Sequence, residues 1–220
     1  MPAGVENSIE DRPTAAGIIV AHPDDETMWA GGAILMHPTW PWDIYALCRG
    51  SDPDRAPRFH RALQRLRASG RIADLNDGPD QTPLPDPLVE QQILSLVGDS
   101  SFDILMTHGP NGEYTTHRRH IETSNAVTAL WRSGRVEASE LWFFAYEDGG
   151  GAHLPRAIEN ADTKIELPPQ VWEEKYGIIH EVYGFDDDTW EARATPKIEA
   201  FWRFTSADQL AEWMRGASSR

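Results

Sequence analysis

The chain has 220 residues, of which 20 are lysine or arginine and 35 are aspartate or glutamate, so its formal net charge is −15. This acidic balance opposes binding to nucleic-acid phosphates or to an anionic membrane surface, and we expect no nucleic-acid partner. The length allows one sizeable core, which predicts a flexible N-terminal tail over residues 1–16 and a single domain over residues 17–220.

The sequence predicts a cytoplasmic protein without a membrane span. Its first residues lack the basic start and apolar segment of a signal peptide, and no run of about 18 apolar residues occurs. The single cysteine, Cys48, lies in the apolar run DIYALC and is expected to be a buried structural thiol. A homo-oligomer is compatible with all of these features.

Short apolar runs of strand length alternate along the chain with segments of helical spacing. This alternation is typical of a doubly wound α/β protein, in which a mostly parallel, Rossmann-like sheet carries helices on both faces. The region over 150–220 begins rich in glycine and proline, and we expect it to form a less regular C-terminal lobe or lid of the same domain. Strands are predicted over 17–21, 42–48, 71–75, 102–108 and 140–146, and helices over 26–37, 58–69, 87–98 and 118–133.

Two polar motifs follow predicted strands, at the strand ends where ligands bind in such sheets. The first, AHPDDE over residues 21–26, gathers one histidine and three acids, and the second, HGPNGEYTTHRRH, places His117 and His120 on one face of a helical turn. Two histidines and one aspartate would supply the three protein ligands of a catalytic zinc site, so the motifs predict a divalent metal. Alternatively, Asp25 and Glu26 only cap the helix that follows them.

These motifs resemble those of the LmbE-like (PIG-L type) zinc-dependent N-acetylglucosaminyl deacetylases over about residues 17–150. The resemblance implies a metal-dependent N-deacetylase that removes an N-acetyl or other N-acyl group from an amino sugar or its conjugate. It implies His22, Asp25 and His120 as ligands of Zn²⁺, with Fe²⁺ as the alternative metal. Asp24 would be the general base that takes a proton from the water activated by the metal.

The same resemblance implies roles for five further residues. His117 would stabilise the developing oxyanion as a cation, and Tyr114 would help to polarise the amide carbonyl. Arg58 would contact the substrate, and Asp77 would form hydrogen bonds with sugar hydroxyls. His180 would lie in or beside the active site, although a surface or core-edge histidine is the alternative interpretation.

The second motif departs from the family pattern, which is commonly H-P-D-H where this chain has HRRH. We expect Arg118 and Arg119 to point outward, where they would bind an anionic substrate group. If Arg119 points inward instead, its charge would lower the pKa of His117. The departure keeps open a catalytically silent metal-binding protein, and an amidase acting on a larger conjugate at the same zinc is a further alternative. Among the tryptophans, Trp172 and Trp190 are the candidates for stacking on a sugar ring.

Overall fold

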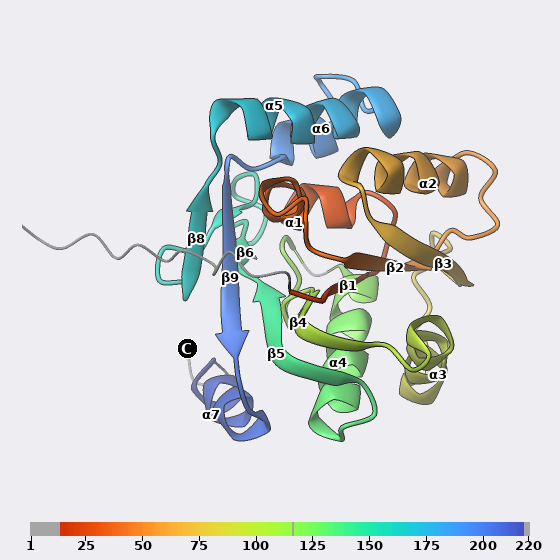
Figure 1. Ribbon diagram of the computed structural model, residues 1–220, viewed down its shortest axis with the longest axis vertical. Helices are drawn as coiled ribbons and strands as arrows, with labels where there is room; N and C mark the ends of the chain where they lie inside the picture. Colours follow the sequence, from red (N-terminus) through yellow and green to blue (C-terminus); the bar gives the residue numbers. More distant parts are fainter. Residues whose placement is uncertain (1–13, 116, 218–220) are drawn as a thin grey trace, which may run out of the picture.

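A single mixed sheet forms the centre of the computed structural model, which describes residues 14–115 and 117–217 (Figure 1). Its first five strands are parallel, and the last two extend it in the antiparallel sense. Strand order runs outward in both directions from β1, as in doubly wound proteins, so the predicted fold class is confirmed. The spatial order is β3 (Ser69–Leu75), β2 (Trp42–Cys48), β1 (Ala16–Val20), β4 (Ser101–Thr107), β5 (Glu137–Phe144), β9 (Ile198–Phe204) and β8 (Thr163–Glu166).

Helices cover both faces of the sheet (Figure 1). One face carries α1 (Asp25–Met36), α2 (Arg55–Leu66) and α5 (Pro169–Gly177), and the other carries α3 (Asp86–Val97), α4 (Arg118–Arg132) and α7 (Ala207–Ala217). The remaining elements are short: β6 (Tyr146–Glu147), β7 (Arg156–Ala157), η1 (Ile178–Val182) and α6 (Trp190–Ala194).

The two faces of the sheet bury two separate apolar cores. In β1, Ile18 and Val20 pack into the core that contains Trp29 of α1, whereas Ile19 packs into the core that contains Val127 of α4. Successive strand residues point to opposite faces, so a strand covered on both sides needs apolar residues throughout. This is why β1 reads as an uninterrupted apolar run in the sequence.

The antiparallel strand β9 carries a fully buried charge, Glu199. Its carboxylate lies 2.7 Å from Nζ of the equally buried Lys175 in α5, and it accepts the backbone N–H groups of Gly32 and Ala33 in α1 at 2.6 and 2.7 Å. A buried charge is tolerated when it is paired and hydrogen-bonded. The pair therefore joins α5 and β9 to the helix that follows the first polar motif.

The C-terminal part of the chain contributes to the same sheet. β8 and β9 both come from the region after residue 150, and they continue the sheet beyond β5. At the other end, β1 begins at Ala16, one residue before the expected start of the domain, and residues 1–13 lie outside the described part of the chain. The division into a tail and one domain with a C-terminal lobe stays a prediction.

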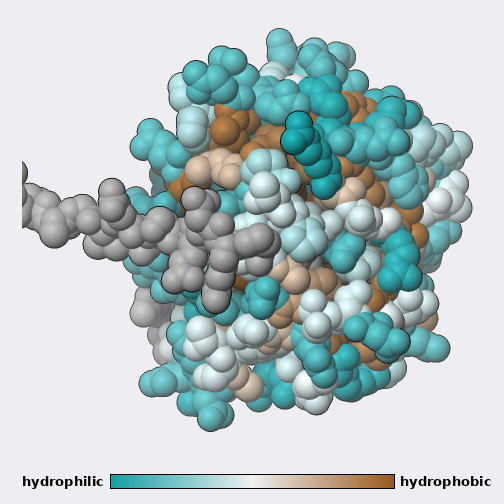
Figure 2. Space-filling view, in the orientation of Figure 1, coloured by the Kyte–Doolittle hydropathy of each residue, from teal (hydrophilic) through white to brown (hydrophobic). Residues whose placement is uncertain are grey.

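The face of the molecule drawn in Figure 2 is largely hydrophilic. Hydrophilic residues form most of the outline of the face drawn in Figure 2, and hydrophobic residues are visible mainly between them. Within residues 14–115 and 117–217, the helices are all too short or too polar to cross a membrane.

Candidate active site

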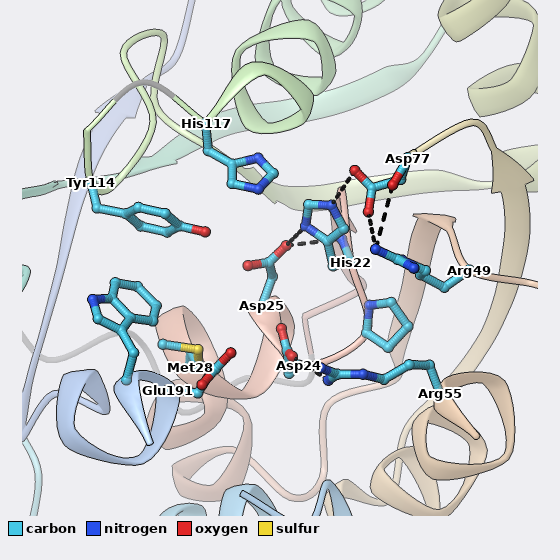
Figure 3. A pocket seen from close by; sticks show the side chains of 12 residues that line it. His22, Asp24, Asp25, Met28, Arg49, Arg55, Asp77, Tyr114, His117 and Glu191 are labelled. Carbon is cyan, nitrogen blue, oxygen red and sulfur yellow. Dashed lines mark hydrogen bonds and ion pairs between the residues drawn. The ribbon is translucent and has the colours of Figure 1, made fainter. Parts of the chain in front are cut away.

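The two polar motifs meet because β1 and β4 are neighbouring parallel strands, with Ile19 opposite Thr107. Their carboxyl ends lie at the same edge of the sheet, and the residues that follow them surround a cavity of about 270 Å³ (Figure 3). The residues singled out from the sequence that line it are His22, Asp24, Asp25, Asp77, Tyr114, His117 and Trp190. The sequence did not single out four others, namely Met28, Arg49, Arg55 and Glu191.

Among the three expected metal ligands, Asp25 places one carboxylate oxygen close to a ring nitrogen of each histidine. Oδ2 of Asp25 is 3.2 Å from Nδ1 of His22 and 3.4 Å from Nε2 of His120. Donor atoms of a tetrahedral zinc site are about 3.3 Å apart, because each lies about 2.0–2.1 Å from the metal. Burial alone would raise the pKa of Asp25, but His120 and His108 hold it well below its usual range. An ionised carboxylate between two imidazoles is therefore a donor set that fits a divalent metal.

Each of these histidines has a carboxylate on its other ring nitrogen. Nδ1 of His120 is hydrogen-bonded to Oε2 of Glu113 at 2.6 Å, whereas Nε2 of His22 lies 3.4 Å from Oδ1 of Asp77 without forming a hydrogen bond. Metal-binding histidines commonly donate their second N–H to a carboxylate, which fixes the tautomer and the ring orientation. Asp77, expected to bind sugar hydroxyls, also pairs with Arg49 at 2.6 Å, and its sugar-binding role stays a prediction.

Glu113 is a site residue that the sequence analysis missed. It is buried, its Oε2 also faces Nδ1 of His108 at 2.8 Å, and its Oε1 accepts the N–H of Gly109 at 3.0 Å. Burial would raise the pKa of Glu113, but His108 and His120 lower it to about 2. The sequence feature that could have indicated Glu113 is its position in a glycine-containing loop, between His108 at the end of a strand and the HRRH motif.

His108 forms a second group of potential metal donors with Asp25 and His120. However, the backbone N–H of Ala21 lies 3.0 Å from Nε2 of His108. A backbone N–H can only donate, so this contact occupies the Nε2 lone pair and leaves the ring proton on Nδ1, which faces Glu113. His108 is thus better suited to support the site than to bind a metal.

Asp24 lies beside the metal donors in an unusual backbone conformation, with φ at 108°. Its carboxylate pairs with Nη1 of Arg55 at 2.9 Å, and its N–H donates to Glu26. Burial and the neighbouring charge of Asp25 raise the pKa of Asp24 well above its usual range, whereas Arg55 opposes the shift. The adjacent carboxylates of Asp24 and Asp25 are thus pushed in opposite directions, as in sites where one acid moves a proton and another stays ionised.

His117 points into the cavity, with its ring centre 4.8 Å from that of His22 and 5.6 Å from that of Tyr114 (Figure 3). Burial, His120 and His22 lower its pKa from 6.5 to about 4. The expected role of His117 as a cation therefore has no support from its surroundings at neutral pH. His22, His117 and His120 together also offer three donor atoms within 4.8 Å of one another, so His117 is a further candidate ligand.

We expect the imidazole of His117 to titrate with a midpoint of about 4 in the metal-free protein. Its folded-state pKa lies below the ordinary value of 6.5, so its contribution to stability is complete above pH 6.5 and is lost as the pH falls to about 4. Histidine ring signals followed by NMR would give the midpoint, and the signal missing from His117→Gln would assign it. A midpoint near 6.5 would contradict the described environment.

The expectation that both arginines of HRRH point outward is wrong for Arg119, which is buried. Its guanidinium pairs with Glu122 and donates to the carbonyls of Asn76 and Thr82 at 2.7 and 2.9 Å. A buried charge is costly unless it is paired, and the Glu122 carboxylate supplies that pair for Arg119. Through these hydrogen bonds, Arg119 of α4 holds the loop that contains Asp77 against the helix.

Two expected substrate-binding residues are not in the cavity lining. Arg58 donates from Nε to Asp54 at 2.8 Å and from Nη1 to the carbonyl of Tyr183. His180 lies 2.9 Å from the carbonyl of Phe185 and is 42% exposed at its side chain. Their roles stay predictions that the placement does not favour.

The C-terminal part of the chain supplies one wall of the cavity. Trp190 and Glu191 come from α6, and the Trp190 ring lies 4.4 Å from that of Tyr114. On the opposite side, Arg55 begins α2 one turn before Arg58. Apolar spacing predicted that this helix begins at Arg58, but α2 begins at Arg55. Arg55 therefore lies in the first turn of the helix and lines the cavity.

Comparison with solved structures shows that the chain has the fold of the LmbE-like deacetylases, the family that its motifs resemble. One such structure is a triple mutant of the deacetylase Orf2* of teicoplanin biosynthesis, with 14% identity, a TM-score of 0.63, and coverage of 89% of this chain and 100% of that one. Another is N,N'-diacetylchitobiose deacetylase from Pyrococcus horikoshii, with 14% identity, a TM-score of 0.63, and coverage of 87% and 84%.

The same fold also occurs in a protein of a different reaction class. GalB, the 4-carboxy-2-hydroxymuconate hydratase from Pseudomonas putida, has 15% identity, a TM-score of 0.63, and coverage of 86% of this chain and 95% of that one. No family model and no curated protein matches the chain. At such identities the likeness establishes the fold, and the chemistry has to be argued from the site.

Proposed function

We propose that the protein is a metal-dependent hydrolase that removes an N-acetyl or other N-acyl group from an N-acetylglucosamine-type amino sugar or its conjugate, with Zn²⁺ as the metal. The observation that carries this proposal is the spacing of His22 Nδ1, Asp25 Oδ2 and His120 Nε2, at 3.2 and 3.4 Å, beside the carboxylate of Asp24. The deacetylases that share the fold add support.

His22, Asp25 and His120 would hold the metal, which when bound supplies a nucleophilic water at neutral pH and polarises the acyl carbonyl. Asp24 would accept the proton of the attacking water as the new C–O bond forms. It would then give this proton to the leaving nitrogen as the C–N bond breaks, which yields a carboxylate and an amine. The raised pKa of Asp24, caused by burial and Asp25, suits a group that both takes and returns a proton.

Tyr114 and Arg55 would support these steps. Burial and nearby carboxylates raise the pKa of Tyr114, so its hydroxyl stays protonated and can donate a hydrogen bond to the acyl oxygen. Arg55 would hold the Asp24 carboxylate in place through its 2.9 Å contact. Glu26 is a poor substitute for Asp24 because its oxygens already accept from the hydroxyls of Thr27 and Tyr183 and from a backbone N–H.

A panel of N-acylated sugars, assayed for released acetate with zinc present, tests this function. We expect turnover by the wild-type protein, and we expect His120→Ala to lose both turnover and bound zinc while remaining folded, because the site joins two preformed loops. Elemental analysis and circular dichroism would check the last two points. Zinc binding without any turnover would instead favour the silent metal-binding protein, and turnover only of larger amides would favour the amidase.

A second candidate function is hydration of a carbon–carbon double bond in an unsaturated carboxylic acid. Two arginines line the cavity, Arg49 and Arg55, and each keeps donors beyond those used for Asp77 and Asp24. Guanidinium groups are suited to binding carboxylates, and one protein of this fold is the hydratase GalB. The test is to add the protein to unsaturated dicarboxylates that contain a conjugated diene and to follow the diene absorbance. A loss of this absorbance, with no acetate released from N-acylated sugars, would favour hydration.

A further inference from the structure

A second, larger hollow adjoins the cavity at His117. This groove, of about 630 Å³, is lined by Gln81, His117, Arg118, Ile121, Glu122 and Asn125. His117 belongs to the lining of both hollows, and Gln81 of the groove donates to Asp77 of the cavity at 2.8 Å. The groove therefore leads away from the metal donors along one side of α4.

The cavity beside the metal donors is small for a whole substrate. Its volume of about 270 Å³ is below the roughly 300–1,000 Å³ of typical small-molecule sites. An amino sugar that carries a further group needs additional space beside this cavity. The adjoining groove is a direct extension, because it begins at a residue that faces the metal donors.

Polar groups in the groove have unused hydrogen-bonding capacity. Within the described part of the chain, the exposed side chain of Arg118 forms no ion pair or hydrogen bond, and the buried Oε1 of Gln81 has no partner. In contrast, the one acid of the groove is occupied, since Glu122 pairs with Arg119 and accepts the N–H of Leu84 at 3.0 Å.

The groove thus offers an unpaired positive charge on a protein with a net charge of −15. Arg118 is the unpaired cation of the lining, and it is also the first residue of the 15-residue helix α4, whose N-terminus carries partial positive charge. An anion placed there would meet a planar guanidinium that can donate two parallel hydrogen bonds. The division of the HRRH motif follows: Arg119 is used for structure, and Arg118 is free to bind a ligand.

We propose that the groove is a second substrate subsite, in which Arg118 binds a carboxylate or phosphate carried by the amino sugar. This inference rests on the proposed function for the identity of the sugar, but the preference for an anion is a property of the groove itself. Arg118 would act as a specificity-determining residue, because it lies outside the set of groups that handle the scissile amide.

Equilibrium binding tests the subsite with three ligands: N-acetylglucosamine, its 6-phosphate, and N-acetylmuramic acid, which carries a carboxylate. Binding is measured on the zinc-loaded protein in an Asp24→Asn background, where ligand is not consumed. We expect the anionic sugars to bind about 10- to 100-fold more tightly than the neutral one, and Arg118→Ala to remove this difference without weakening the neutral sugar. Whichever anion shows the larger preference is the better mimic of the natural group.

Arg132→Ala is the matched control, because it removes an exposed arginine from the other end of the same helix. It should bind all three sugars as the parent does, and Arg118→Lys should keep part of the preference. No preference in the parent, an unchanged preference in Arg118→Ala, or an equal loss in Arg132→Ala would each overturn the proposal. Acetate release is recorded separately on the Asp24 protein, so an anion preference without turnover contradicts the proposed function and not the subsite.

Discussion

Asp24→Asn is expected to lower kcat for the N-acyl sugar by about 10²- to 10⁴-fold while zinc content stays near that of the wild-type protein. Asparagine keeps the shape of the side chain and can still accept a hydrogen bond from Arg55, but it cannot take a proton from water. Because Asp24 is next to the ligand Asp25 and is not itself one of the close donor atoms, the metal should remain. Turnover and elemental analysis on the same preparation check both parts.

The control for this change is Asp80→Asn, which alters an exposed aspartate in the loop after Asp77 and should leave turnover unchanged. If Asp24→Asn keeps most of its turnover, another group takes the proton. His117 would then be the first alternative, because its lowered pKa leaves it neutral and able to accept a proton at pH 7. A loss of zinc together with turnover would instead make Asp24 part of the metal site.

The strands and helices that position the site could be predicted from the sequence because their signals are local. Strand β1 is buried on both faces and is followed at once by AHPDDE, and α4 has a clear helical spacing that begins at the HRRH motif. Parallel strands present their carboxyl ends at one edge of the sheet, so two polar motifs at such ends were expected to converge. Asp25 of the first motif does lie 3.4 Å from His120 of the second, and 3.2 Å from His22, whereas their role as metal ligands stays a prediction.

The remaining parts of the site depend on contacts between distant segments, which a local pattern does not contain. Strand β9 was missed because Glu199 interrupts its apolar pattern, and that charge is tolerated only through Lys175, 24 residues earlier, and two amides of α1. Likewise, nothing near Arg119 in the sequence indicates the carbonyls of residues 76 and 82 that hold it inside.

Glu113→Gln is expected to weaken zinc binding by about 10- to 100-fold, even though Glu113 is not among the expected ligands. The carboxylate orients His120 through Nδ1 at 2.6 Å, which directs Nε2 of the same ring toward Asp25. Glutamine has one acceptor oxygen in place of two, so it cannot serve the rings of His120 and His108 and the N–H of Gly109 together. Competition with a zinc chelator at pH 7 would measure the loss.

Glu137→Gln is the matched control, since it changes an exposed glutamate at the start of β5 and should leave zinc affinity unchanged. A purely structural role for Glu113 would lower the unfolding temperature of the metal-free protein but leave zinc affinity of the folded molecules at the wild-type level. That result would contradict the positioning of His120 by Glu113. Glu113→Asp, which keeps the charge on a shorter side chain, should fall between the wild-type protein and Glu113→Gln.

The pH dependence of stability gives a second test of Glu113 that does not involve metal. The neighbouring histidines depress its pKa from 4.5 in the unfolded chain to about 2 in the folded protein, despite the opposing effect of burial. The stabilisation from the ionised carboxylate is therefore complete above pH 4.5 and is lost as the pH falls toward 2. Glutamine does not titrate, so the difference in unfolding free energy between the metal-free wild-type protein and Glu113→Gln should shrink through this pH range. A difference that stays constant would mean that Glu113 is not held as a buried anion between the two imidazoles.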